Sequence, residues 1–120
     1  MSQNQGVGRR GEELAARHLQ QLGLRVLERN VRLPEGEIDL VARESEELVI
    51  VEVKTRIGDA ETAPDVAVTA AKLERLGRLA DAYATRLGTP EQDWRVDVVA
   101  VVLARNGRII RIDHLPGAYL

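Results

Sequence analysis

Three charged residues interrupt two stretches that otherwise resemble β-strands. Asp39 lies within EIDLV, and Glu52 and Lys54 lie within LVIVEVKT. Because side chains alternate between the two faces of a strand, Glu52 and Lys54, two residues apart, share one face. Two carboxylates with an ammonium group beside them predict a metal site for cutting a phosphodiester. The alternative is a salt bridge at the end of a strand.

Hydrolysis of a phosphodiester needs a nucleophilic water, neutralisation of the charge on the phosphate and help for the leaving oxygen. Mg²⁺ or Mn²⁺ supplies much of this when hard oxygen ligands hold it and leave positions open. We expect Asp39 and Glu52, with a backbone carbonyl such as that of Val53, to bind the ion. Lys54 is expected to orient or deprotonate the attacking water and to stabilise charge on the phosphate.

A third carboxylate is expected from a helix over residues 9–23. On a helical wheel of about 100° per residue, Glu12 falls inside the apolar face. Glu13 falls on the polar face, where it can pair with Arg17 four residues later. We expect Glu12 to hold a second metal ion or a metal-bound water; the alternative is a favourable contact with the helix dipole in the first turn. Without a metal, repulsion among three converging carboxylates would raise one of their pKa values.

The elements that must position these residues follow the order α-βββ-α-ββ. After the first helix, the alternation of apolar residues predicts strands at 24–33, 37–43 and 48–55, of which the third is central because it is apolar on both faces. A helix is expected from the N-cap Thr69 to about Leu87, followed by strands at 94–103 and 108–113 joined by a turn at Asn106-Gly107. The sequence therefore predicts a flexible polar tail at residues 1–8 and a single α/β domain at residues 9–120.

Two further charged residues interrupt apolar patterns. Lys72 lies within the buried stripe of the second helix but in its first turn, where a cation opposes the helix dipole, so a phosphate or carboxylate partner is expected. The alternative is a lysine that reaches solvent from the helix edge. Asp97 interrupts the strand at 94–103 and either supports the site or is the buried partner of Arg95 or Lys72.

Composition narrows the class of protein. A chain of 120 residues is expected to form one domain with a modest core. The absence of Cys excludes disulfides and Cys-based zinc or redox chemistry, and two isolated His argue against a His-rich metal site. No signal peptide and no apolar run of about 18 residues is recognised, so we expect a cytoplasmic protein with no membrane partner.

The charge distribution is more informative than the net charge of −2. Residues 1–32 carry six Arg against three Glu, whereas residues 33–65 carry three basic against ten acidic residues. The acidic excess coincides with the candidate site, as expected where cations complete the charge, and the flanking basic segments can meet phosphates. The basic residues expected to contact nucleic acid are Arg9, Arg10, Arg56 and Lys72.

Several segments together resemble a known family. They are GRRGEELAARHLQQLGLRVLERN, GEIDLV, VIVEVKTR, VTAAKLERLGRLADAY and WRVDVV. Over residues 8–114 the chain resembles the YraN-like family of small bacterial proteins, which is similar to archaeal Holliday-junction resolvases and to the PD-(D/E)xK, restriction-endonuclease-like nucleases. The resemblance implies a central mixed β-sheet flanked by helices and a nuclease-type metal site. In it, Glu12 matches the acid of the GE motif, Asp39 the Asp of GEID, Glu52 and Lys54 the ExK pair, and Lys72 a basic position that opens the second helix.

The sequence thus predicts a metal-dependent DNA endonuclease that uses Mg²⁺ or Mn²⁺ and acts on branched or otherwise structured DNA. The analogy with resolvases suggests a homodimer, because symmetric cutting of two strands calls for two sites related by a two-fold axis. Two alternatives stay open. One is a nucleic-acid-binding module that keeps the nuclease fold with little activity; the other is a structural interaction domain with neither metal dependence nor DNA affinity.

Overall fold

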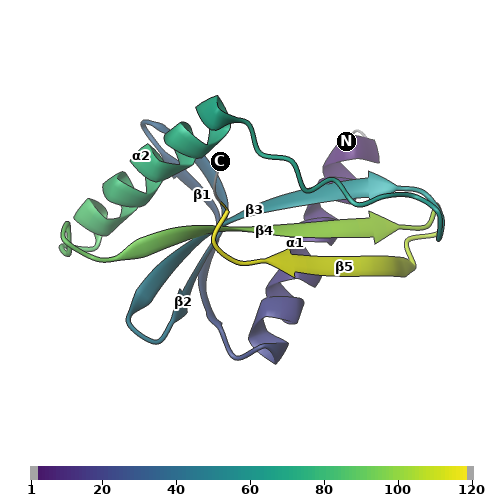
Figure 1. Ribbon diagram of the computed structural model, residues 1–120, viewed down its shortest axis with the longest axis horizontal. Helices are drawn as coiled ribbons and strands as arrows, with labels where there is room; N and C mark the ends of the chain where they lie inside the picture. The colour runs from purple at the N-terminus through teal and green to yellow at the C-terminus, as the bar shows by residue number, and fades with distance from the viewer. Residues whose placement is uncertain (1–2, 119–120) are drawn as a thin grey trace.

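The computed structural model describes residues 3–118 as one α/β domain (Figure 1). In chain order its elements are α1 (Gln3–Gln21), β1 (Arg25–Leu33), β2 (Gly36–Glu44), β3 (Glu47–Ile57), α2 (Ala70–Arg86), β4 (Trp94–Leu103) and β5 (Ile109–Leu115). The order α-βββ-α-ββ confirms the predicted fold class. Within this described part of the chain, neither helix has an apolar segment of the length that a membrane crossing needs.

The five strands form one sheet in the order β1-β2-β3-β4-β5. Three neighbouring pairs are antiparallel, and β3 and β4 are parallel, joined by a crossover that contains α2. A parallel pair requires such a crossover, because the chain must return to the same end of the sheet. The sheet is therefore mixed, as the family resemblance implied. The position of β3 in the middle confirms the prediction from its apolar run.

The two helices cover opposite faces of the sheet, and α1 passes behind β3, β4 and β5 in the view of Figure 1. One apolar cluster joins α1 to alternate strand residues, including Leu14, Leu19, Leu40, Val49, Val51 and Val99. The other joins α2 to the residues between them, including Ile38, Val41, Leu48, Ile50, Leu76 and Leu79. Glu52 follows Ile50 on the α2 face, and Lys54 follows Glu52, as the two-residue period predicts.

Helix α1 lies close against β3 at Gly11. A Cβ atom added to Gly11 would lie 1.9 Å from Thr55 Oγ1, so a larger residue at this buried position would force the Thr55 side chain or the helix to shift. The contact holds the following residue, Glu12, beside the second half of β3, where Glu12, Val53 and Thr55 line a common hollow.

Several element boundaries differ from those predicted by one or two residues, and the start of α1 differs by more. Helix α1 begins at Gln3 rather than near Arg9, so residues 3–8, predicted to be a tail, are helical; Met1, Ser2 and residues 119–120 lie outside the described residues. The segment has no apolar period and contains two glycines, which lower helix propensity, so its sequence gave no helix signal. Strand β5 extends to Leu115 because β4 continues to pair with it as far as Val98.

Candidate active site at the fork between β2 and β3

The site is built where β2 and β3 separate. The backbones of the two strands pair as far as Leu40 and Val51. Beyond that point the Asp39 side chain takes the place of a backbone partner, because its Oδ2 accepts a hydrogen bond from the Val53 N–H at 2.8 Å. Ile38 packs on the α2 side and Leu40 on the α1 side, so β2 twists at Asp39. The Asp39 carboxylate consequently lies in the gap between the strands, open to groups from both faces.

Three carboxylates approach this gap from three elements. Burial raises the pKa of Asp39 to about 7, although the hydrogen bond from the Val53 N–H opposes the shift. The side chain and charge of Glu52 and the charge of Glu12 raise the pKa of Asp39 further. Burial also raises the pKa of Glu12, against a hydrogen bond from the side chain of Asn30. The pKa of Asp39 is thus raised mainly by its burial, and the charges of Glu52 and Glu12 add to the rise in the direction expected for neighbouring carboxylates.

Two carboxylate oxygens at the gap lack hydrogen-bond donors. Glu12 Oε2 and Glu52 Oε2 are buried without a hydrogen-bond partner among the described residues. Lys72 Nζ lies 3.1 Å from Glu52 Oε2, so the two are ion-paired, but the direction of approach does not make a hydrogen bond. For Glu52 the Lys72 ammonium offsets the cost of burial, whereas Glu12 Oε2 is a buried oxygen that water or a cation would stabilise.

The carboxylates do not form a complete metal cage by themselves. Among residues 3–118, no group of three or more Asp, Glu, His or Cys side chains is arranged to hold a metal ion. A divalent ion bound by Asp39 and Glu52 would therefore also need a backbone carbonyl and water as ligands. Mg²⁺ sites commonly have this composition, with one or two carboxylates and several waters.

A cavity of about 300 Å³ opens next to the gap. It lies between the β1–β2 turn and the first turns of α2, and its lining includes Gly36, Asp39, Glu52, Lys72 and Arg75. Lys72 was predicted to find a carboxylate or phosphate partner, and its pair with Glu52 confirms the carboxylate. Arg75 was not predicted, because an exposed arginine on a helix gives no sequence signal.

Lys54 has a partner that the sequence did not indicate. Its Nζ lies 3.4 Å from both carboxylate oxygens of Asp65, in the segment between β3 and α2. Both side chains are partly buried, so the pair is more than a fully solvated surface contact. The salt-bridge alternative therefore describes Lys54 correctly, with Asp65 as partner. An isolated acid in a loop has no periodicity by which to predict this contact.

The alternative role considered for Glu12 is wrong. Because α1 begins at Gln3, Glu12 lies well inside the helix, and the dipole effect is confined to the first turn. Glu13, by contrast, accepts a hydrogen bond from Arg17 at 2.8 Å, as predicted for the polar face. The two adjacent glutamates therefore face different surroundings.

The three predicted nucleic-acid-binding arginines are all exposed. Arg10 donates from Nε and Nη2 to the Gly107 carbonyl at 3.2 and 3.0 Å, and Arg56 donates to the Ala63 carbonyl at 3.2 Å. Arg9 lies near enough to Glu12 for its charge to oppose the rise in the pKa of Glu12. These contacts place Arg9 beside the candidate site and Arg10 and Arg56 toward the far end of β3.

Asp97 belongs to a separate cluster. It is fully buried and accepts hydrogen bonds from the Arg95 guanidinium and from the Gly117 N–H. Its Oδ2 also lies at hydrogen-bond distance, 2.7 Å, from His114 Nε2. Burial would raise the pKa of Asp97, but these hydrogen bonds outweigh it and leave the pKa lowered. The prediction of a buried partner for Arg95 is confirmed. His114 lay beyond the predicted end of β5 and was missed.

The raised pKa of Asp39 predicts how the stability of the metal-free protein depends on pH. Between about pH 4 and pH 7 the folded protein holds a proton that the unfolded chain has released, so the free energy of unfolding should fall as pH rises through this range. The variant Asp39→Asn should lack this dependence and be the more stable protein at pH 8. Urea unfolding in EDTA from pH 5 to 8 measures both, and parallel curves for the two proteins would contradict the prediction.

Sequence comparison places the chain among related proteins. Residues 11–101 match the family described as Uncharacterised protein family UPF0102. A UPF0102 protein of Beutenbergia cavernae is 47% identical over 117 residues, which is 98% of each chain. Relatives from Symbiobacterium thermophilum and an Arthrobacter species are each 50% identical, over 86% and 92% of this chain and 87% and 93% of theirs. The YraN-like resemblance is thereby confirmed, and the chain belongs to the UPF0102 family.

Proposed function

We propose that this protein is a Mg²⁺- or Mn²⁺-dependent endonuclease that hydrolyses phosphodiester bonds in DNA. The observation that carries the proposal is the Asp39 carboxylate in the β2–β3 gap, with Glu52 beside it and with a buried oxygen of Glu12 that has no hydrogen-bond partner among the described residues. Carboxylates that serve only the fold are normally supplied with donors. Carboxylates brought together with raised pKa values and too few donors are typical of functional sites.

The residues at the gap fit a divalent metal ion. Asp39, Glu52 and a backbone carbonyl such as that of Val53 would hold it, and Glu12 would hold a second ion or a bound water. All these donors are hard oxygens, which suit Mg²⁺ and Mn²⁺. When bound, such an ion neutralises charge on the phosphate and makes water a better nucleophile.

The cationic side chains complete the proposed site. Lys54 lies on the same face as Glu52, and Asp65 holds its Nζ in place, so its charge can stabilise negative charge that develops on the phosphate oxygens. Lys72 neutralises Glu52 in the structure described here. Once a cation meets Glu52, Lys72 and the neighbouring Arg75 are free to contact phosphates of the substrate.

The preferred substrate is proposed to be branched or otherwise structured DNA, cut by a homodimer. The support for this is the resemblance to Holliday-junction resolvases and the two-fold symmetry that paired cuts require. A nucleic-acid-binding module with little activity is the second candidate. It is favoured by one observation, that Lys54 and Glu52 are already neutralised by Asp65 and Lys72.

Incubation of the purified protein with four-way, flapped, single-stranded and linear DNA tests the proposal. Cleavage is expected with Mg²⁺ or Mn²⁺ and is expected to be absent in EDTA. Salt-dependent binding without cleavage under any metal would favour the binding module. If neither binding nor cleavage occurs, the result favours the third alternative, a structural interaction domain.

Metal binding can be measured apart from activity. At pH 8, saturating Mn²⁺ should raise the melting temperature, because an ion that binds only the folded state at 100 times its Kd adds about 2.7 kcal/mol. The rise should vanish in the double variant Asp39→Asn, Glu52→Gln. An equal rise in both proteins would place the ion elsewhere.

A further inference from the structure

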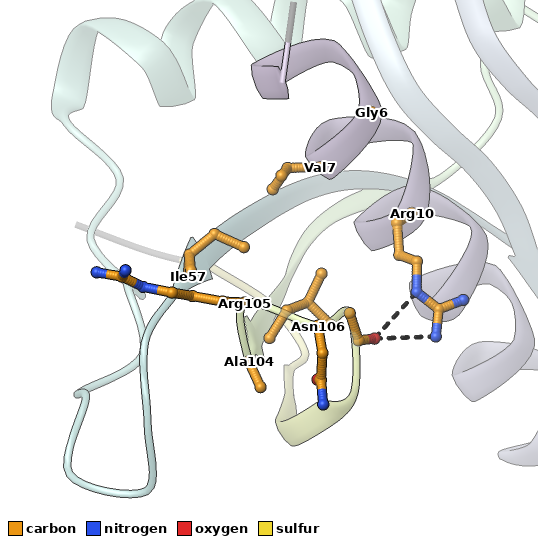
Figure 2. Close-up of a pocket in the computed structure, with 9 residues that line it drawn as sticks. Gly6, Val7, Arg10, Ile57, Ala104, Arg105 and Asn106 are labelled. Atoms are coloured by element: carbon orange, nitrogen blue, oxygen red, sulfur yellow. Dashed lines mark hydrogen bonds between the residues drawn. The ribbon is translucent and has the colours of Figure 1, made fainter.

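A second concave site lies away from the carboxylates. It is a cleft of about 680 Å³ between the first turns of α1 and the β4–β5 turn (Figure 2). Its lining includes Val7 and Arg10 of α1, Ile57 at the end of β3, and Arg105 and Gly107 in the turn. Its volume is within the range of about 300–1,000 Å³ that is usual for ligand-binding clefts.

The walls of the cleft are tied together. The two hydrogen bonds from Arg10 to the Gly107 carbonyl, drawn in Figure 2, join α1 to the β4–β5 turn. The turn is further held by a hydrogen bond from the Arg108 N–H to Asn106 Oδ1, and the Gly58 N–H donates to the Leu103 carbonyl across its floor. The cleft is therefore formed before any ligand arrives.

The chemistry of the lining is cationic at the rim and apolar at the floor. Arg10 and Arg105 line the cleft, Arg108 is exposed in the same turn, and Val7 and the half-exposed Ile57 supply apolar surface. A sugar–phosphate backbone has the matching pattern, since guanidinium groups bind phosphates and the deoxyribose presents an apolar edge. This cationic rim occurs on a chain whose net charge is −2.

The acidic residues that follow Ile57 in the sequence, Asp59 and Glu61, do not line the cleft. Asp59 accepts hydrogen bonds from the Glu61 N–H and the Thr62 hydroxyl, so its carboxylate stabilises the turn that follows β3. Neither Asp59 nor Glu61 is among the lining residues. The charge of the lining side chains is therefore positive.

The cleft adjoins a second hollow that reaches Glu12. This smaller hollow of about 240 Å³, lined by Gly8, Glu12, Val53 and Thr55, shares Val7 with the cleft. Arg9 lies near enough to Glu12 for its positive charge to favour the ionised carboxylate of Glu12. The residues of α1 that line either the cleft or the hollow beside it are thus Gly6, Val7, Gly8, Arg10 and the proposed metal ligand Glu12.

We infer that the cleft between α1 and the β4–β5 turn binds the sugar–phosphate backbone of a DNA strand that leaves the active site. Arg105 and Arg108 contact its phosphates, and Val7 and Ile57 contact its sugars. The inference rests on the proposed function for the origin of the strand. The binding itself needs neither metal nor cleavage, so it can be tested separately.

The double variant Arg105→Ala, Arg108→Ala tests the inference in EDTA, with labelled single-stranded, duplex and four-way DNA and fluorescence anisotropy from 50 to 200 mM salt. Affinity should fall about tenfold or more, because hydrogen bonds to charged groups are lost. The slope of log K against log salt should become shallower by about 1 to 2, since up to two phosphate contacts disappear.

The matched control Arg17→Ala, Arg86→Ala removes the same charge from residues that pair with Glu13 and Glu28 and do not line the cleft. The control should change neither quantity by as much.

A second variant probes the floor without removing an arginine. Ile57→Asp places a carboxylate beside the expected path of the backbone and should also weaken binding about tenfold. Arg10 is left intact because it ties α1 to the turn. Circular dichroism of each variant establishes that the fold is retained.

The outcomes separate the inference from the proposed function. Loss of affinity in both cleft variants, in a protein that never cleaves DNA, supports the cleft and overturns the nuclease. Metal-dependent cleavage by the wild type, with affinity and salt slope unchanged in both variants, overturns the cleft and leaves the nuclease. Displacement of DNA by polyglutamate at equal residue concentration would overturn the inference in favour of an acidic protein partner.

Discussion

Replacing Glu52 with glutamine is expected to lower the rate of metal-dependent DNA cleavage by about a thousandfold or more. Glu52 is one of two carboxylates that would hold the metal ion, and the amide keeps its size while removing its charge. Stabilisation of a transition state by a bound metal ion is worth several kcal/mol, and about 4 kcal/mol corresponds to a thousandfold change in rate. Single-turnover cleavage of the best DNA substrate measures the effect.

The control for this variant is Glu13→Gln. Glu13 is adjacent to Glu12 but pairs with Arg17 on the exposed side of α1, so its loss should change the rate less than twofold. The free energy of unfolding of Glu52→Gln should stay within about 1 kcal/mol of the wild type, because a partly exposed ion pair contributes little. If Glu52→Gln cleaves at close to the wild-type rate, the fork between β2 and β3 is not the active site.

The largest loss of stability is expected for Asp97→Asn, at about 3 kcal/mol or more, because removing one partner of a buried ion pair costs about 3–5 kcal/mol. Asp97 is fully buried and is hydrogen-bonded by Arg95, His114 and the Gly117 N–H. An asparagine has one acceptor oxygen, and its amide would point hydrogens at one or more of these donors.

Urea unfolding at pH 7 measures this loss, with Asp113→Asn as control. Asp113 pairs with Arg111 at 2.6 Å on the exposed side of β5, where an ion pair contributes about 0–1 kcal/mol. The lowered pKa of Asp97 gives a second test, since its stabilisation is complete above the unfolded pKa of about 3.8 and is lost as pH falls through the lower folded value. A loss below 1 kcal/mol in Asp97→Asn would show that the cluster is not important for the fold.

Asp97 and Asp39 illustrate how a structural carboxylate differs from the one proposed here to be functional. Asp97 receives hydrogen bonds from three residues, and its pKa is lowered. Asp39 receives one from the Val53 N–H, lies beside two other carboxylates, and has its pKa raised to about 7. The negative charge of Asp97 is stabilised by donors within the protein, whereas that of Asp39 needs a proton or a cation to stabilise it.

Much of this arrangement could be predicted from sequence because it depends on local periodicity. The two-residue period of a strand placed Glu52 and Lys54 on one face, and the helical period separated Glu12 from Glu13. The predicted strand at 94–103 coincides with β4 (Trp94–Leu103), and the N-cap at Thr69 is present, accepting from the Lys72 N–H. Each of these features is decided by residues within a few positions of one another.

Other features depended on contacts between distant segments, and only the tertiary structure could decide them. The start of α1 has weak helix propensity and is held by Arg10 against Gly107, 97 positions away. The partner of Lys54 is an acid in a loop, and the cleft combines α1 with a turn near the other end of the chain. The sequence by itself determined the order of the elements, their buried faces and the acids that face inward. Packing decided which charges meet, because that depends on where β2 and β3 separate and how closely α1 lies on β3 at Gly11.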